Sequence, residues 1–144
     1  MKPRLSKAAA QLREQFDVTY PSRDRSSDGW IGDTRHATRP SDHNPDANGW
    51  VRAIDVDRDV SGKSKPDLMP DIADQIRLLC KSKREKRITY IIFDGRIASP
   101  KKGWAWREYT GANKHNHHCH ISFSQEADDD GAFFQVPMLG AAHE

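Results

Sequence analysis

Four of the chain's seven histidines lie within residues 115–120, in the string HNHHCH, and an apolar stretch follows directly. Imidazole is the commonest protein metal ligand and titrates near neutral pH. Side chains two residues apart on a strand share a face, so a strand here would present His118 and His120 on one side and bury Cys119 on the other. The cluster predicts a metal or proton-transfer site, although a histidine-rich polar loop is the simpler interpretation.

A second alternating segment offers the carboxylate that such a site needs. In VRAIDVDRD, Asp55 faces away from Ile54 and Val56, as on a strand with one polar face. If this strand lies beside the histidine strand, Asp55 and His120 can meet, and His43 in the loop SDHNPD offers a third ligand. Two histidines and a carboxylate, with a fourth position left for water, form the ligand set of a catalytic zinc site. Taken singly, a carboxylate at a strand end and a solvated loop histidine are the simpler interpretations.

Several short strings share their order with a known signature. They are Ser41-x-His43, Gly49, Ala53-x-Asp55 and His118-x-His120. In this order they resemble the SxHxxGxAxD…HxH motif of LAS-type zinc peptidases, which include D-Ala-D-Ala carboxypeptidases, murein endopeptidases and hedgehog-like domains. Over roughly residues 1–125 the chain is similar in particular to the catalytic domains of actinobacteriophage endolysins.

The resemblance implies one zinc ion (Zn2+) per chain, with His43, Asp55 and His120 as its ligands. Twelve positions separate His43 from Asp55, more than in the wider group, which implies an inserted turn at NPDANG. His117, three residues before the last ligand, stands where many members have a glutamate. Penicillin-insensitive murein endopeptidases likewise lack that glutamate and use histidines, and His115 and His118 stand at the matching offsets from His120. By that resemblance His115 and His118 are the acid/base and transition-state groups, and which of them does which stays open.

Four further residues are candidates for contacting a peptide substrate. Arg39 and Arg107 could hold a carboxylate through two parallel hydrogen bonds. Trp106, in an aromatic loop, could line a cleft, and Ser41 belongs to the motif. Solvated loop arginines and a tryptophan packed in the core are the alternatives.

Hydrophobic periodicity predicts a small α+β domain with an LAS/hedgehog-like fold. We expect helices over residues 5–16 and 67–83, and about four strands in a small antiparallel sheet. The expected strands are 53–57, 87–93, 96–99 and 118–123, and Asp94-Gly95 predicts a tight hairpin turn. A long polar loop covers residues 20–50, which is typical of a functional segment. We expect the catalytic domain to span residues 1–127 and a C-terminal tail to span 128–144.

Composition narrows the class of partner. The 144 residues carry a net charge of only +2, so no electrostatic footprint for nucleic acid is evident. No apolar run is long enough to cross a membrane, and the amino-terminal segment does not resemble a secretion signal. We expect a monomer that is made in the host cytoplasm and acts on the cell wall.

The leading hypothesis is a zinc metallopeptidase, of phage endolysin type, that cuts the stem peptide or cross-link of bacterial peptidoglycan. The scissile bond stays open among L-Ala–D-Glu, D-Ala–diaminopimelate and diaminopimelate–diaminopimelate links. Two alternatives remain: an inactive zinc-containing module that binds cell wall, and a histidine-rich metal-dependent nuclease suggested by the strings SDHNPD and HNH.

Overall fold

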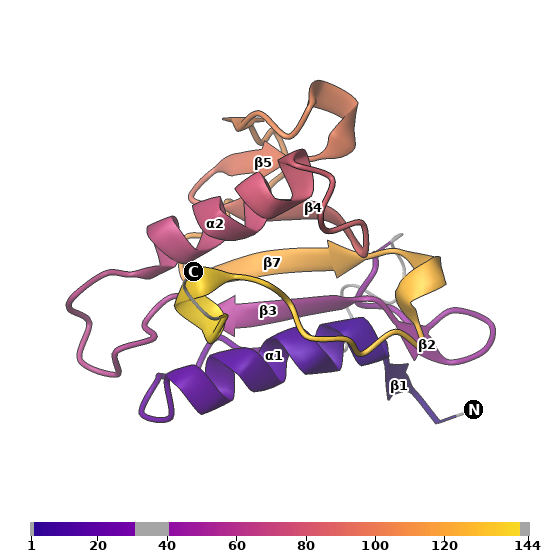
Figure 1. Cartoon of the computed structure of the whole chain (residues 1–144), viewed down its shortest axis with the longest axis horizontal. Coiled ribbons are helices and arrows are strands. Elements are labelled where there is room, and N and C mark those ends of the chain that lie inside the picture. The colour runs from indigo at the N-terminus through magenta and orange to yellow at the C-terminus, as the bar shows by residue number, and fades with distance from the viewer. Residues whose placement is uncertain (1, 31–40, 142–144) are drawn as a thin grey trace.

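The computed structural model describes residues 2–30 and 41–141, and within them the chain is an α+β protein (Figure 1). Its helices and strands, in chain order, are β1 (Arg4–Leu5), α1 (Lys7–Thr19), β2 (Trp50–Val51), β3 (Ala53–Asp57), α2 (Met69–Lys81), β4 (Ile88–Phe93), β5 (Arg96–Ala98), β6 (Arg107–Glu108) and β7 (His118–Phe123). The α+β class, the antiparallel sheet and both helices are as the sequence predicts.

The main sheet has five antiparallel strands in the order β3-β7-β4-β5-β6, and β1 pairs with β2 in a separate parallel pair. The expected number of about four strands is therefore too low. The additional strand, β6, is only two residues long, too short to show an alternating pattern. Within the sheet β7 lies between β3, the edge strand, and β4, so a strand near the end of the chain joins two earlier ones.

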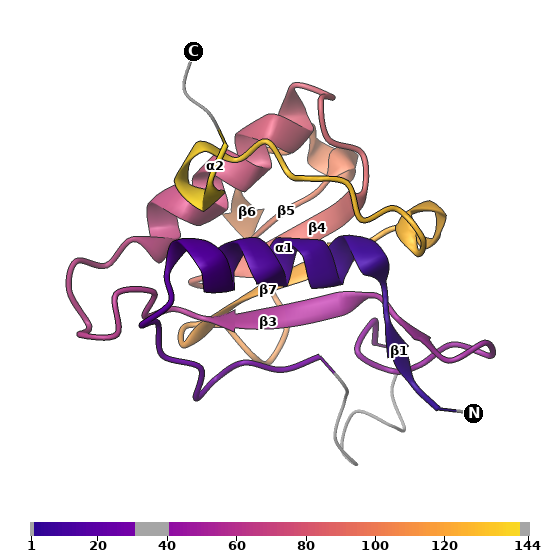
Figure 2. The ribbon, with the colours of Figure 1, turned by 60° about the horizontal axis from the view of Figure 1, so that its bottom comes forward.

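Both helices contribute to one apolar cluster on one face of the sheet (Figure 2). Ser6 caps the amino-terminal end of α1, and its hydroxyl accepts a hydrogen bond from the Ala9 amide. The buried side chains of α1, Leu12 and Phe16 among them, belong to the same cluster as those of α2; α2 packs against β4, and α1 packs against β3 and β7. The opposite sides of the same strands carry the polar residues.

The segment after residue 127, expected as a tail, packs against both helices, and Figure 2 shows it in yellow passing between α1 and α2. Phe134, Val136 and Leu139 are at most 1% exposed. The Gln15 side chain of α1 donates to the carbonyl oxygens of Phe134 and Leu139 and accepts from the Phe134 amide. This segment is therefore part of the core.

Within residues 2–30 and 41–141, neither helix has the length and apolar character needed to cross a membrane.

Candidate metal centre

The pairing of β3 with β7 places Asp55 directly opposite His120. This is the meeting that the two alternating segments predicted. Cys119 is fully buried on the other face of β7, and Cys80 of α2 is 2% exposed, so both cysteines are free thiols of the core. Burial raises the pKa of both thiols, and it raises the pKa of Cys80 to about 12. Neither thiol is therefore ionised at neutral pH.

His43 reaches the same point from the loop before β2. The expected turn at NPDANG is present: the Gly49 amide donates to the Asp46 carbonyl, and Gly49 has a φ of 87°, in the left-handed region that glycine tolerates. The Arg52 amide donates to the Asp42 carbonyl, which anchors the loop beside β3. The turn absorbs the extra residues and keeps His43 close to the sheet.

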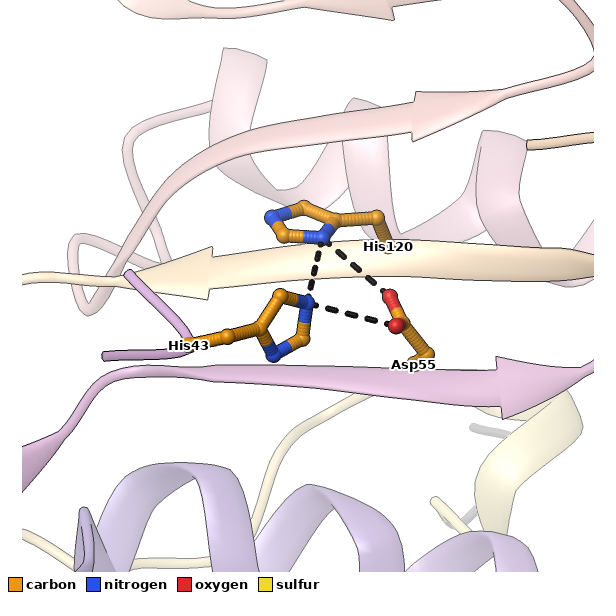
Figure 3. Close-up of side chains that lie close together, drawn as sticks. All are labelled: His43, Asp55 and His120. Carbon is orange, nitrogen blue, oxygen red and sulfur yellow. Dashed lines mark hydrogen bonds and ion pairs between the residues drawn. The ribbon is translucent and has the colours of Figure 1, made fainter. Parts of the chain in front are cut away.

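Two ring nitrogens and the two oxygens of one carboxylate converge from these three residues (Figure 3). His43 Nε2 lies 3.1 Å from His120 Nδ1 and 3.2 Å from Asp55 Oδ2, and His120 Nδ1 lies 3.2 Å from Asp55 Oδ1. Ligands bound about 2.0–2.1 Å from a tetrahedral zinc ion are separated from one another by about 3.4 Å. The donor types and their mutual distances therefore fit a zinc ion or a similar divalent cation.

Hydrogen bonds on the far sides of the two imidazole rings support this fit. His43 Nδ1 lies 2.9 Å from the Trp30 carbonyl oxygen, which can only accept, so Nδ1 carries the hydrogen and a neutral ring has its lone pair at Nε2. His120 Nε2 lies 2.8 Å from the Ser122 hydroxyl, and a hydrogen donated there leaves the lone pair at Nδ1. Two lone pairs and a carboxylate then face one another, an arrangement that a cation stabilises.

The Asp55 carboxylate is ionised at neutral pH. Burial works against its charge, but hydrogen bonds and charge interactions with His120 and His43 outweigh burial and hold the pKa of Asp55 far below its ordinary value. Burial also lowers the pKa of His43, yet its hydrogen bond to Asp55 and the carboxylate charge raise the pKa overall. The site therefore supplies a fixed negative charge that attracts either a proton or a metal ion.

His115 and His118 lie beside this triad. Their ring centroids are 5.0 Å apart, and His115 is 5.4 Å from His120. Among the described residues, the buried side-chain polar atoms without a hydrogen-bond partner are Nδ1 of His115 and Nε2 of His118. Burial, together with the charge of neighbouring histidines, lowers the pKa of His115 to about 4. Burial also lowers the pKa of His118. Both rings are thus neutral at pH 7, and each has a nitrogen available to a ligand.

Three of the four residues that were predicted to contact a substrate lie in the described part of the chain, and each forms a hydrogen bond within the protein. Ser41 lies in the His43 loop, and its hydroxyl accepts from the His43 amide. Trp106 donates its indole hydrogen to Asp74 of α2, which places that ring toward the helix-covered side of the sheet. Arg107 donates to the Ser99 hydroxyl. Arg39 falls outside the residues that the structure describes.

Two groups at the centre are missing from the sequence analysis. Tyr90 of β4 stacks on His120, with ring centroids 5.4 Å apart and an interplanar angle of 10°, and burial raises the pKa of Tyr90 to about 12. A tyrosine hydroxyl in the middle of the otherwise mostly apolar strand RITYIIF is the signal that could have identified it. The Trp30 carbonyl has no such signal, because any residue has a carbonyl group.

Comparison with known proteins adds no relative: no family model, no curated protein and no solved structure matches this chain.

Proposed function

We propose that this protein is a zinc-dependent peptidase of the LAS type that cleaves a peptide bond in bacterial peptidoglycan. One observation carries the proposal. A three-residue ligand set, His43, Asp55 and His120, lies directly beside two buried imidazole nitrogens that have no hydrogen-bond partner within the described residues. A structural zinc site is closed by four protein ligands, whereas a hydrolytic site keeps a position open and has proton-transfer groups next to it.

The residues divide into two sets by their chemistry. His43, Asp55 and His120 would hold the ion, and Trp30 and Ser122 orient the two imidazoles. When bound there, zinc would supply a Lewis acid for the scissile carbonyl and would lower the pKa of a water molecule toward neutrality. His118 and His115 have neutral, unpartnered ring nitrogens, so they can accept a proton from the attacking water and return it to the leaving amine.

The choice of peptidoglycan as substrate rests on the resemblance of the motifs to murein endopeptidases and endolysins. The mild basic excess of the chain agrees with a polyanionic wall. The three candidate links are distinguished by the fragments that each releases.

Digestion of a purified peptidoglycan of defined chemistry tests this function. We expect new amino groups to appear in the presence of zinc, and mass spectrometry of the soluble fragments then identifies the bond. His43→Ala is the matched inactive variant, because it removes a ligand that lies in a loop outside the sheet.

Three results would contradict the proposal. Zinc binding without release of amino groups would indicate a wall-binding module. Metal-dependent cleavage of DNA without wall hydrolysis would indicate a nuclease. Hydrolysis unaffected by His43→Ala would place the active site elsewhere.

A further inference from the structure

A second group of ligand atoms lies beside the first. One oxygen of Asp55 and one ring nitrogen each of His115 and His118 lie within 4.8 Å of one another. His118 Nε2 is 3.6 Å from Asp55 Oδ1, too long for a hydrogen bond. This group shares only Asp55 with the set formed by His43, Asp55 and His120.

His115 is the residue whose environment points most directly to a ligand. It is 8% exposed, and its Nδ1 is buried without a hydrogen-bond partner in the described part of the chain. Leaving such a nitrogen unpaired destabilises the folded chain, so native proteins usually supply a partner. A ligand absent from the polypeptide can be that partner.

The backbone holds His115 in place at an energetic cost. Its φ of 57° lies in the left-handed region, which histidine adopts infrequently. The Asn113 side chain accepts from the His115 amide, and the Asp94 amide donates to the His115 carbonyl. A strained residue fixed by its neighbours and directed at a cluster of ligands is typical of a functional position.

We propose that a second divalent cation of the zinc type binds Asp55, His115 and His118, so that Asp55 joins two metal ions. A carboxylate has two oxygens with about four lone-pair positions, enough to contact two ions. In this chain Asp55 Oδ2 lies next to His43, and Oδ1 lies near both His120 and His118. Imidazole and carboxylate together select zinc and its neighbours over magnesium or calcium, which prefer oxygen ligands.

The second ion has a consequence for activity. It occupies the ring nitrogens of His115 and His118, which then cannot transfer protons, so excess zinc inhibits the enzyme. This consequence rests on the proposed peptidase function, whereas binding of the second ion does not.

Equilibrium dialysis of the full chain against zinc at increasing free concentration, with the zinc per chain counted, tests the second site. We expect wild type to bind one ion at low zinc and to saturate at two. His115→Asn removes the ring nitrogen while keeping a residue that tolerates the left-handed backbone, and it should saturate at one. The dissociation constant of the second ion should increase at least about 100-fold, since even outer partners of a metal contribute 10–100-fold.

His117→Asn is the control, because His117 is exposed and belongs to neither group of ligands. It should still bind two ions. His118→Gln is an independent variant of the same site and should also saturate at one, so misfolding of one variant leaves the other to decide the result.

Saturation of wild type at one ion, or at two ions in both His115→Asn and His118→Gln, would overturn the second site. A different result would contradict the peptidase proposal while leaving the second site intact. In that case two ions would bind, and no amino groups would be released from peptidoglycan at any zinc concentration.

Discussion

At the scale of single residues, His43 and His120 present different ring nitrogens to the same point. His43 offers Nε2 because Nδ1 is bound to the Trp30 carbonyl, and His120 offers Nδ1 because Nε2 contacts Ser122. Each imidazole is thus oriented by a partner on its far side. The residue types of the ligands follow from the sequence, but the choice of nitrogen depends on contacts that only the folded chain makes.

Ser122→Ala tests whether orientation of His120 matters. Ser122 is fully buried, and its hydroxyl lies 2.8 Å from His120 Nε2. Losing such a partner typically lowers metal affinity 10–100-fold, and we expect a decrease of about that size in competition with a zinc chelator. Ser124→Ala, two residues further along, is the control. Equal zinc affinity in wild type and Ser122→Ala would show that the hydroxyl does not orient the ligand.

Single substitutions of neighbouring histidines separate proton transfer from metal binding. His118→Ala removes a buried ring nitrogen beside the triad, so we expect zinc to stay bound and wall hydrolysis to decrease about 100-fold or more. His117→Ala should have a small effect, because that side chain is exposed. The measurement is zinc content alongside hydrolysis rate. If His117→Ala were inactive and His118→Ala nearly normal, the acid/base role would belong to His117 and not to His118.

At the scale of secondary structure, alternation was the informative signal. The strings AIDVD and HCHISF predict which side chains point inward, and the pairing of Asp55 with His120 follows once β3 and β7 are neighbours. The aromatic loop around Trp106 has no periodicity, so the sequence could not show that its indole contacts Asp74 of α2. Strands of two residues, such as β1 and β2, are also too short to show a period, so their pairing was not predicted.

Arg58 connects the elements around the site. Its guanidinium binds Asp67, in the segment before α2, and Asp94, in the turn after β4. The Asp94 amide in turn donates to the His115 carbonyl. Arg58 therefore helps to hold the turn that supports His115.

Asp67→Asn should change the pH dependence of stability. The hydrogen bond from Arg58 lowers the pKa of Asp67, so its contribution to the free energy of unfolding is present above about pH 4, the unfolded value, and is lost as the pH decreases through the lower folded value. Because the pair is partly exposed, we expect about 1 kcal/mol or less at pH 7. Denaturant unfolding of both proteins from pH 7 to pH 2 measures the difference. A difference that does not shrink in acid would contradict this role.

At the scale of the whole molecule, the C-terminal segment completes the core. Apolar residues follow the string DDD in this segment, but they show no helical or strand period, and the segment was therefore expected to be a tail. Three buried apolar side chains and the hydrogen bonds from Gln15 instead attach it to α1, on the side of the sheet opposite the candidate metal centre.

Two adjacent phenylalanines test this packing. Phe134 is fully buried, and Phe134→Ala should destabilise the protein by about 3–5 kcal/mol through lost burial and the cavity left behind. Phe133 is 44% exposed, and Phe133→Ala should cost much less, about 1 kcal/mol. Chemical denaturation of the two variants gives both values. Equal values would mean that the segment does not pack as described.

The central claim is that His43, Asp55 and His120 form a metal centre that hydrolyses peptidoglycan. The most direct measurement is the rate of amino-group release from purified peptidoglycan by protein that has been stripped with a chelator and then given zinc in fractions of an equivalent. We expect no release before zinc is added, a rate that increases up to one equivalent, and no recovery in His43→Ala. Undiminished release by the stripped protein, or no release at any amount of zinc, would contradict the claim.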